Sequence, residues 1–67
     1  MQIIYNDKMD LLYLRLDEGK QTVVNRRLSE DIVLDVGADE RIVGIEILDA
    51  SRHLNLERLL PIKYERV

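Results

Sequence analysis

Apolar residues in this 67-residue chain recur mainly at every second position, and short polar turns separate the segments in which they do so. A period of two places alternate side chains on opposite faces of a β-strand, whereas a helix needs a period near 3.6. In residues 11–16, for example, Leu12, Leu14 and Leu16 share one side. The pattern predicts five strands, at residues 1–5, 11–16, 22–28, 31–36 and 41–48.

Two of these strands have features that indicate their place in a sheet. Residues 41–48 carry apolar side chains on both sides, which is typical of a central strand covered on two faces. Residues 22–28 are the most polar, and Arg26 and Arg27 put a cation on each side. Charge on both faces is typical of an edge strand.

The apolar spacing changes to a partly helical one between residues 49 and 60. Asp49 and Ser51 are both credible N-caps for this segment. Asn55 leaves open whether the segment is one helix or two short pieces. The alternation returns in residues 62–67, where a terminal strand is compatible with the pattern. We therefore expect a single α+β domain spanning 1–67: a small antiparallel β-meander of about five strands, with a C-terminal helical segment that covers one face.

The absence of Cys, Trp and Phe limits how this domain can be stabilised. A chain of this size hides only about 60% of the surface that its unfolded form exposes. Without Cys it has no disulfide and no cysteine-based zinc site, and we expect no metal and no cofactor. Association is the usual remaining route to stability, so a homo-oligomer, with a dimer favoured, is the expected state.

Charge and hydropathy exclude several classes of partner. The net charge is −3, with acids and bases spread along the chain, so nucleic-acid binding is not expected. No apolar run approaches the roughly 20 residues of a membrane span, and the N-terminus lacks a signal-peptide layout. We expect a cytoplasmic protein. The many charged residues also suit a thermophile.

Two segments resemble one known family. Residues 5–14 read YNDKMDLLYL, and residues 32–36 and 43–51 read IVLDV and VGIEILDAS. They are similar to the "domain of unknown function 2283" family of small bacterial and archaeal proteins, over residues 5–51. The family commonly has a glycine before the opening residue of the last strand, where this chain has Glu40.

The resemblance implies a small, stand-alone protein whose activity is uncharacterised. Some members of the family lie near small toxin-like genes. The resemblance therefore adds one alternative function, an antitoxin-like neutraliser of a small cytosolic toxin.

Glu46, Asp49 and His53 are the nearest approach to a reactive cluster, and a small enzyme that uses them is a further alternative. On a helix, Asp49 and His53 face the same way and could orient an imidazole as a general base. The competing interpretation is a cap, a solvated or dimer-bridging carboxylate and a surface histidine. The sequence has no nucleophile, metal set or phosphate loop to support catalysis, so we assign no catalytic residue.

The leading hypothesis is a non-enzymatic protein that oligomerises or binds a protein partner. Tyr5 and Tyr13 flank one predicted hairpin and could stack a base, although cross-strand packing is the commoner role. Gly44 lies within a strand, under a bulky neighbour such as Tyr13 or against another backbone at an interface. The candidate contacts are Tyr5, Tyr13, Arg26, Arg27, Gly44, Glu46, Asp49, Ser51 and His53.

Overall fold

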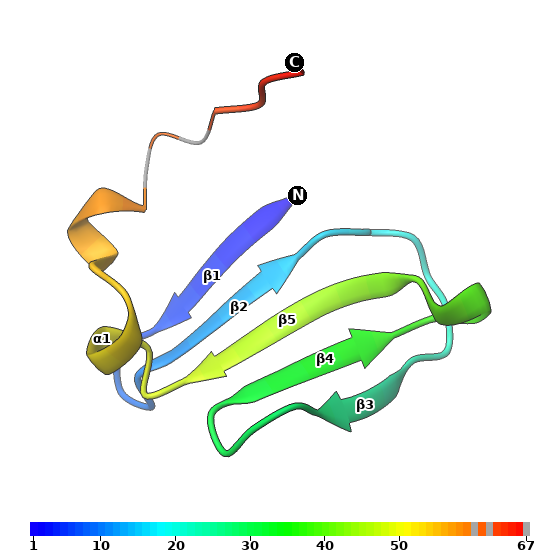
Figure 1. The fold of residues 1–67 in the computed structure, drawn as a ribbon, viewed down its shortest axis with the longest axis horizontal. Helices are drawn as coiled ribbons and strands as arrows, with labels where there is room; N and C mark the ends of the chain where they lie inside the picture. The colour runs from blue at the N-terminus through cyan, green and yellow to red at the C-terminus, as the bar shows by residue number, and fades with distance from the viewer. Residues whose placement is uncertain (60, 62, 67) are drawn as a thin grey trace.

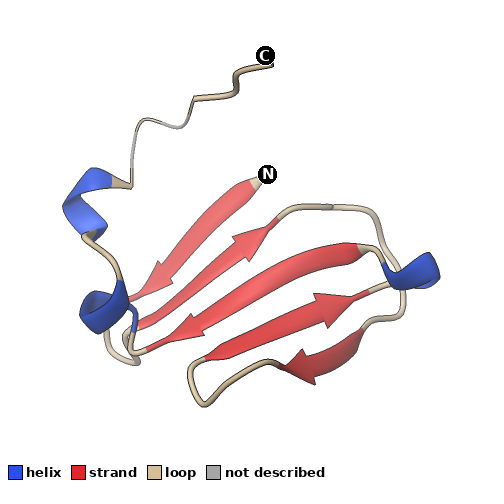
Figure 2. Ribbon diagram, viewed as in Figure 1, coloured by secondary structure: helices blue, strands red, loops and turns tan. Residues whose placement is uncertain are grey.

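The computed structural model of the chain describes residues 1–59, 61 and 63–66. The five predicted strands are confirmed, with ends that differ by at most two residues from the prediction. In chain order, the elements are β1 (Gln2–Asn6), β2 (Leu11–Arg15), β3 (Val24–Arg27), β4 (Ile32–Val36), η1 (Ala38–Glu40), β5 (Ile42–Leu48), α1 (Ala50–His53) and η2 (Leu56–Arg58) (Figure 1). Strand therefore predominates, and the helical part consists of short turns (Figure 2).

All five strands form one antiparallel sheet in the order β1-β2-β5-β4-β3. The predicted meander holds within β1-β2 and within β3-β4-β5. A simple meander would also pair β2 with β3, and this part of the prediction is wrong. The connection after β2 instead carries the chain to the far edge, and β5 pairs with β2. As predicted, β5 is central, and β3 is an edge strand whose residues are all exposed.

The strand register divides the sheet into an apolar face and a polar face. Directly opposed residues of antiparallel strands point to the same side. The apolar face is made of two rows across β1, β2, β5 and β4: Ile3, Leu14, Ile45 and Leu34, then Tyr5, Leu12, Ile47 and Ile32. The polar face carries Gln2, Arg15, Gly44, Asp35 and Asn25 in one row and Ile4, Tyr13, Glu46, Val33 and Arg27 in the next.

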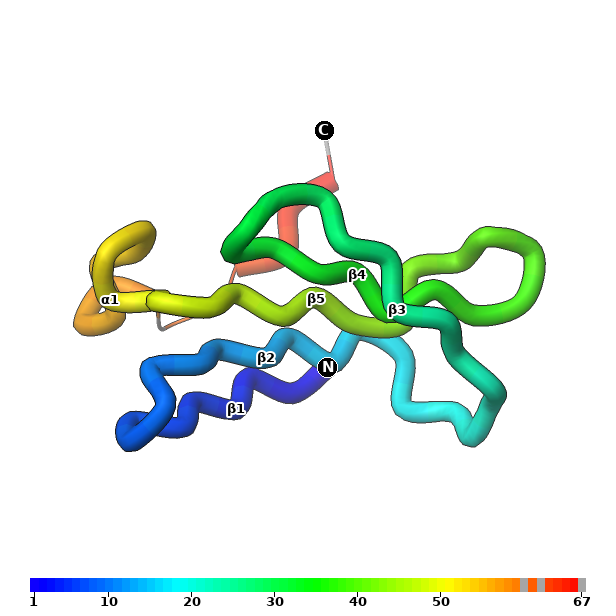
Figure 3. The backbone as a smooth tube through the Cα atoms, turned by 90° about the horizontal axis from the view of Figure 1, so that it is seen from below, coloured from blue at the N-terminus to red at the C-terminus, as the bar shows by residue number. Residues whose placement is uncertain are grey.

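The sheet forms a single twisted layer, and a long loop joins β2 to β3 (Figure 3). The molecule measures 33 × 33 × 20 Å, and its radius of gyration is 12.7 Å. A compact chain of this length would have a radius near 11 Å. Among the described residues, the buried apolar side chains are Leu12, Val33, Val36, Val43 and Ala50. The core of one copy is therefore small.

The C-terminal helical segment consists of two short pieces, α1 and η2, beside one end of the sheet (Figures 1 and 2). The Asn55 side chain accepts a hydrogen bond from the Glu57 amide and so caps η2. Asp49 occupies the N-cap position of α1 but adopts a left-handed φ of 51° and makes no side-chain cap. Asp49 thus has the predicted position, but the prediction that the side chain of Asp49 or Ser51 caps the helix is wrong. A residue distant in the sequence accepts the capping hydrogen bond, as described below.

The predicted terminal strand at 62–67 lies partly outside the described residues. The described part, residues 63–66, is exposed and has no strand structure.

The turn before β5 is built on two residues with positive φ. Asp39 and Glu40 have φ of 56° and 59°, and the Arg41 amide donates to the Ala38 carbonyl at 3.2 Å. This is the geometry of a type I′ turn, which favours Asp-Gly or Asn-Gly at its centre. Gly37, by contrast, has a φ of −97° and does not supply the unusual conformation. A glycine at position 40 is therefore what the turn geometry itself favours.

Candidate functional site

Asp10 joins the first hairpin to the start of α1. It follows the turn after β1 and adopts a left-handed φ of 51°. Its carboxylate accepts the Ser51 hydroxyl at 2.6 Å, the Ser51 amide at 3.1 Å and the Tyr5 hydroxyl at 2.7 Å. Its carbonyl also accepts the Ala50 amide at 2.9 Å. Because amides at the first turn of a helix lack partners within the helix, Asp10 acts as a cap supplied from 41 residues away.

These hydrogen bonds set the acid–base properties of the cluster. The bonds from Ser51 and Tyr5 stabilise the ionised carboxylate and lower the pKa of Asp10 below its ordinary value. The same bond to Asp10 raises the pKa of Tyr5. At neutral pH the cluster is therefore a carboxylate held by two neutral hydroxyl groups.

A second set of contacts runs along the polar face. The Tyr13 ring lies over Gly44, and its hydroxyl donates to Asp35 at 2.8 Å. Asn25 donates to the other oxygen of the same carboxylate. The Arg15 guanidinium lies 5.6 Å from the centre of the Tyr13 ring and donates to Gln2. Five side chains of this face are thus linked from β1 to β3: Gln2, Arg15, Tyr13, Asp35 and Asn25.

Burial is the main cause of the raised pKa of Tyr13, and the hydrogen bond to Asp35 adds to it. Arg15 acts in the opposite direction and lowers this pKa. Tyr13 therefore stays neutral and keeps its proton on the bond to Asp35.

Of the two readings of Gly44, the structure bears out the first, since Tyr13 occupies the space above it. The two tyrosines of the hairpin lie on opposite faces of the sheet, because Tyr5 is opposite Leu12 and Tyr13 is opposite Ile4. They neither pack on each other nor form a platform for one base.

The predicted cluster of Glu46, Asp49 and His53 is not assembled. The imidazole of His53 lies 2.8 Å from Asp31, not beside Asp49. The carboxylate of Asp49 lies 3.9 Å from Arg52, and Glu46 is part of the polar face opposite Tyr13. The helix α1 has only four residues, and Asp49 lies outside it in a left-handed conformation. Asp49 and His53 therefore do not share a helix face, as they would in a longer helix.

The two arginines of the β3 edge are both engaged within the chain. Arg26 forms an ion pair with Glu40 at 2.8 Å, which lowers the pKa of Glu40. Arg27 donates to the carbonyl of Glu30 at 2.6 Å and to that of Ser29. These contacts hold the loop ends next to β3, and each guanidinium keeps an exposed side.

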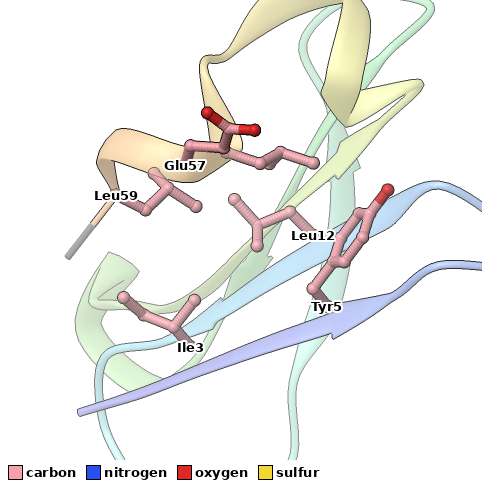
Figure 4. A pocket seen from close by; sticks show the side chains of 6 residues that line it. Ile3, Tyr5, Leu12, Glu57 and Leu59 are labelled. Atoms are coloured by element: carbon pink, nitrogen blue, oxygen red, sulfur yellow. The ribbon is translucent and has the colours of Figure 1, made fainter.

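A shallow groove of about 320 Å³ lies between the apolar face and the C-terminal segment (Figure 4). Ile3, Tyr5 and Leu12 form its floor on β1 and β2. Leu56, Glu57 and Leu59 form the opposite wall. The helical segment therefore lines this end of the face. Over β5 and β4, Val43 and Val36 are buried, whereas Leu34, Ile45 and Ile47 are partly exposed.

Within the described ranges, no group of three or more His, Cys, Asp or Glu side chains could hold a metal ion. No helix of the described chain is long and apolar enough to cross a membrane.

The comparisons with known proteins identify a family. The model of the family described as "Protein of unknown function (DUF2283)" matches residues 2–51. The chain belongs to this family. A curated relative of the DUF2283 chain, named "Putative hypoxanthine phosphoribosyltransferase" and from Methanosarcina mazei, is 54% identical over 37 residues. That match covers 52% of this chain and 30% of the relative, and no solved structure matches.

The two segments that carry the DUF2283 resemblance meet at Asp10. Tyr5 and Asp10 come from the first segment, and Ala50 and Ser51 end the second. Sequence reasoning singled out Tyr5 and Ser51 as contact residues but treated Asp10 only as part of a turn. Asp10 and Ser51 are 41 residues apart, so no local sequence pattern could have predicted their contact.

Proposed function

We propose that this DUF2283 protein is a non-enzymatic module that acts by associating, first of all with a second copy of itself. The observation that carries the proposal is the apolar face, most of whose side chains stay partly exposed to water in a single copy. Of its two rows, only Leu12 is fully buried. Ile32 and Tyr5 are exposed by 37% and 41%. The other five side chains of the two rows are half-buried.

The accessible area supports this proposal quantitatively. The chain exposes 5705 Å². A folded monomer of 7.9 kDa is expected to expose about 4,400 Å², which leaves an excess of about 1,300 Å². Part of the excess belongs to the exposed residues 61 and 63–66. A standard interface removes about 800 Å² from each partner, so the excess is of the size that one interface covers.

The polar face does not need to be covered by a partner. Tyr13, Asp35 and Arg15 have hydrogen-bond or cation–π partners there, so water can meet that face at little cost. Apolar side chains gain roughly 1.5–3 kcal/mol each on full burial. A contiguous apolar surface of this kind marks an interaction site more often than a free surface.

The alternatives have less support. The enzyme alternative needed Glu46, Asp49 and His53 in one place, and they are dispersed. The activity in the name of the Methanosarcina protein is not carried over, because the match covers less than a third of that protein. The antitoxin-like role stays a prediction, and co-expression with a neighbouring toxin-like gene would test it.

Sedimentation equilibrium on the full chain tests the proposal. We expect a molar mass of twice 7.9 kDa at micromolar concentration. A mass of 7.9 kDa at every accessible concentration would overturn self-association.

A further inference from the structure

The sheet has two open edges, β1 and β3, and their residues differ in charge. An edge strand offers unpaired backbone groups to any other strand, and proteins commonly protect such edges with charged side chains. The β3 edge reads VNRR and has this protection in Arg26 and Arg27. The β1 edge reads QIIYN and has no charged residue.

The outer side of β1 is also free of backbone partners. In the described part of the chain, the backbone hydrogen bonds of β1 go to β2. The polar contacts of the β1 side chains stay within the chain: Tyr5 bonds Asp10, Gln2 bonds Arg15, and Asn6 accepts from the Lys8 and Met9 amides. Nothing that the structure describes therefore lies hydrogen-bonded along this edge.

We propose that two copies of the chain pair through β1, antiparallel, and so form one continuous ten-stranded sheet. This inference rests on the proposed function in that it needs a second copy, and it names the edge at which that copy binds. The apolar face is extended by this pairing and is not covered by it. A two-fold axis perpendicular to the sheet relates such strands, and it keeps the apolar face of one copy continuous with that of the other. Opposed residues of an antiparallel pair point to the same side of the sheet. The axis therefore lies midway between two copies of one residue, so that this residue faces itself across the interface.

An axis through Ile4 uses the whole strand and suits its residues. It places Ile4 opposite the same residue of the second copy and Ile3 opposite Tyr5, a β-branched residue facing an aromatic one. Gln2 then faces Asn6, two neutral amides. No like charges meet, although the whole chain carries a net charge of −3. In β3 the equivalent axis through Arg26 would oppose two guanidinium groups.

The pairing also places the two grooves next to each other. Ile3 and Tyr5 form the floor of the groove on the strand that would pair, and Leu56 and Leu59 stand above it. Two copies related through β1 therefore bring two half-exposed apolar clusters into one surface. The area removed from water would come from the β1 edge and from the groove side chains directly beside it. A second copy offers both, whereas a single peptide strand offers only the edge.

Cysteine cross-linking tests the pairing directly, since the chain has no Cys of its own. Opposed antiparallel residues have Cα atoms about 4.5–5.5 Å apart, within the range of a disulfide. The variant Ile4→Cys should form a disulfide-linked dimer under mild oxidation. The matched control is Val24→Cys on the β3 edge, whose side chain is more exposed, 64% against 44%.

We expect Ile4→Cys to cross-link on the order of a hundredfold faster than Val24→Cys, because a paired thiol meets its partner at a millimolar effective concentration. Equal rates, or faster linkage of Val24→Cys, would overturn the β1 pairing. If the unmodified chain still sediments as a dimer in that case, the proposed function survives and its geometry is wrong. A monomeric chain would overturn both.

A charge variant gives a second readout. Ile4→Lys places two ammonium groups opposite each other across the axis and should convert the dimer to monomer, while the circular dichroism of the sheet remains. Val24→Lys is the control and should leave the molar mass unchanged. A dimer that persists in Ile4→Lys, or one that is lost in Val24→Lys, contradicts the pairing through β1.

Discussion

The ring of Tyr13 lies in the space that a side chain at position 44 would need, and its hydroxyl reaches Asp35 across that glycine. A Cβ at position 44 would come within 2.6 Å of the ring carbon Cζ and 2.8 Å of Cε1. The glycine in the middle of β5, which weakens a strand by itself, is thus required by a contact between β2 and β4 that passes over it.

Gly44→Ala should therefore destabilise the fold. The new methyl group displaces the Tyr13 ring and breaks its bond to Asp35, and overpacking of this kind costs about 1–3 kcal/mol. Denaturant unfolding monitored by circular dichroism measures the change.

The same variant made in a Tyr13→Ala background provides the control. With the ring absent, the methyl group meets no clash, so the cost of Gly44→Ala should shrink by at least about 1 kcal/mol. Additive costs in the double variant would show that the ring is not what excludes a side chain at position 44.

Glu40 occupies a position that suits glycine, since its φ is 59° at the second centre of the type I′ turn. Glu40→Gly should be more stable than Glu40→Ala by about 1 kcal/mol, because a left-handed conformation costs an L-residue roughly that amount. Both variants lose the ion pair with Arg26, so their difference isolates the backbone. Thermal unfolding that ranks Ala above Gly would refute this assignment of the turn.

Asp10→Asn should loosen the start of α1, because an amide accepts the Ser51 and Tyr5 hydrogen bonds less strongly than a carboxylate. Loss of a cap of this kind lowers the Tm by an amount on the order of 5 °C. Asp7→Asn removes a charge from the same turn and is the control, expected to leave the Tm nearly unchanged. Equal effects of the two variants would mean that only net charge matters.

The pKa of Asp10 also predicts how stability depends on pH. In the folded chain it lies below the ordinary value of 3.8, so the folded state binds protons less readily than the unfolded state. The stability that Asp10 contributes is present above that ordinary value and is lost as the pH falls through the folded pKa. Glu40 acts in the same direction. The Tm of Asp10→Asn should therefore fall less steeply on acidification than that of the unmodified chain, and parallel curves would contradict this origin of the acid sensitivity.

Much of the sheet could be predicted because a period of two is a local property. The alternation at Leu12 and Leu14 identified β2, and apolar residues on both sides identified β5 as central. The pairing of β2 with β5 could not be predicted in the same way. Alternation tells which side chains share a face, but it does not tell which strand lies alongside.

The contacts of the candidate site join residues that are far apart in the sequence, and local sequence patterns do not predict such contacts. Asp10 caps a helix that starts 40 residues later, and His53 pairs with Asp31 on the loop before β4. The position of Tyr13 over Gly44 was predictable because a glycine within a strand asks for a bulky neighbour. The turn at Asp39 and Glu40 was not, since glutamate disfavours the conformation that it adopts there.

The central claim is that a second copy of this domain stabilises the folded chain. The most direct measurement is the Tm of the full chain as a function of protein concentration, because association that stabilises the folded state makes unfolding concentration-dependent. We predict a Tm that rises steadily with concentration. A Tm that stays constant, from concentrations far below micromolar to far above it, would contradict the claim.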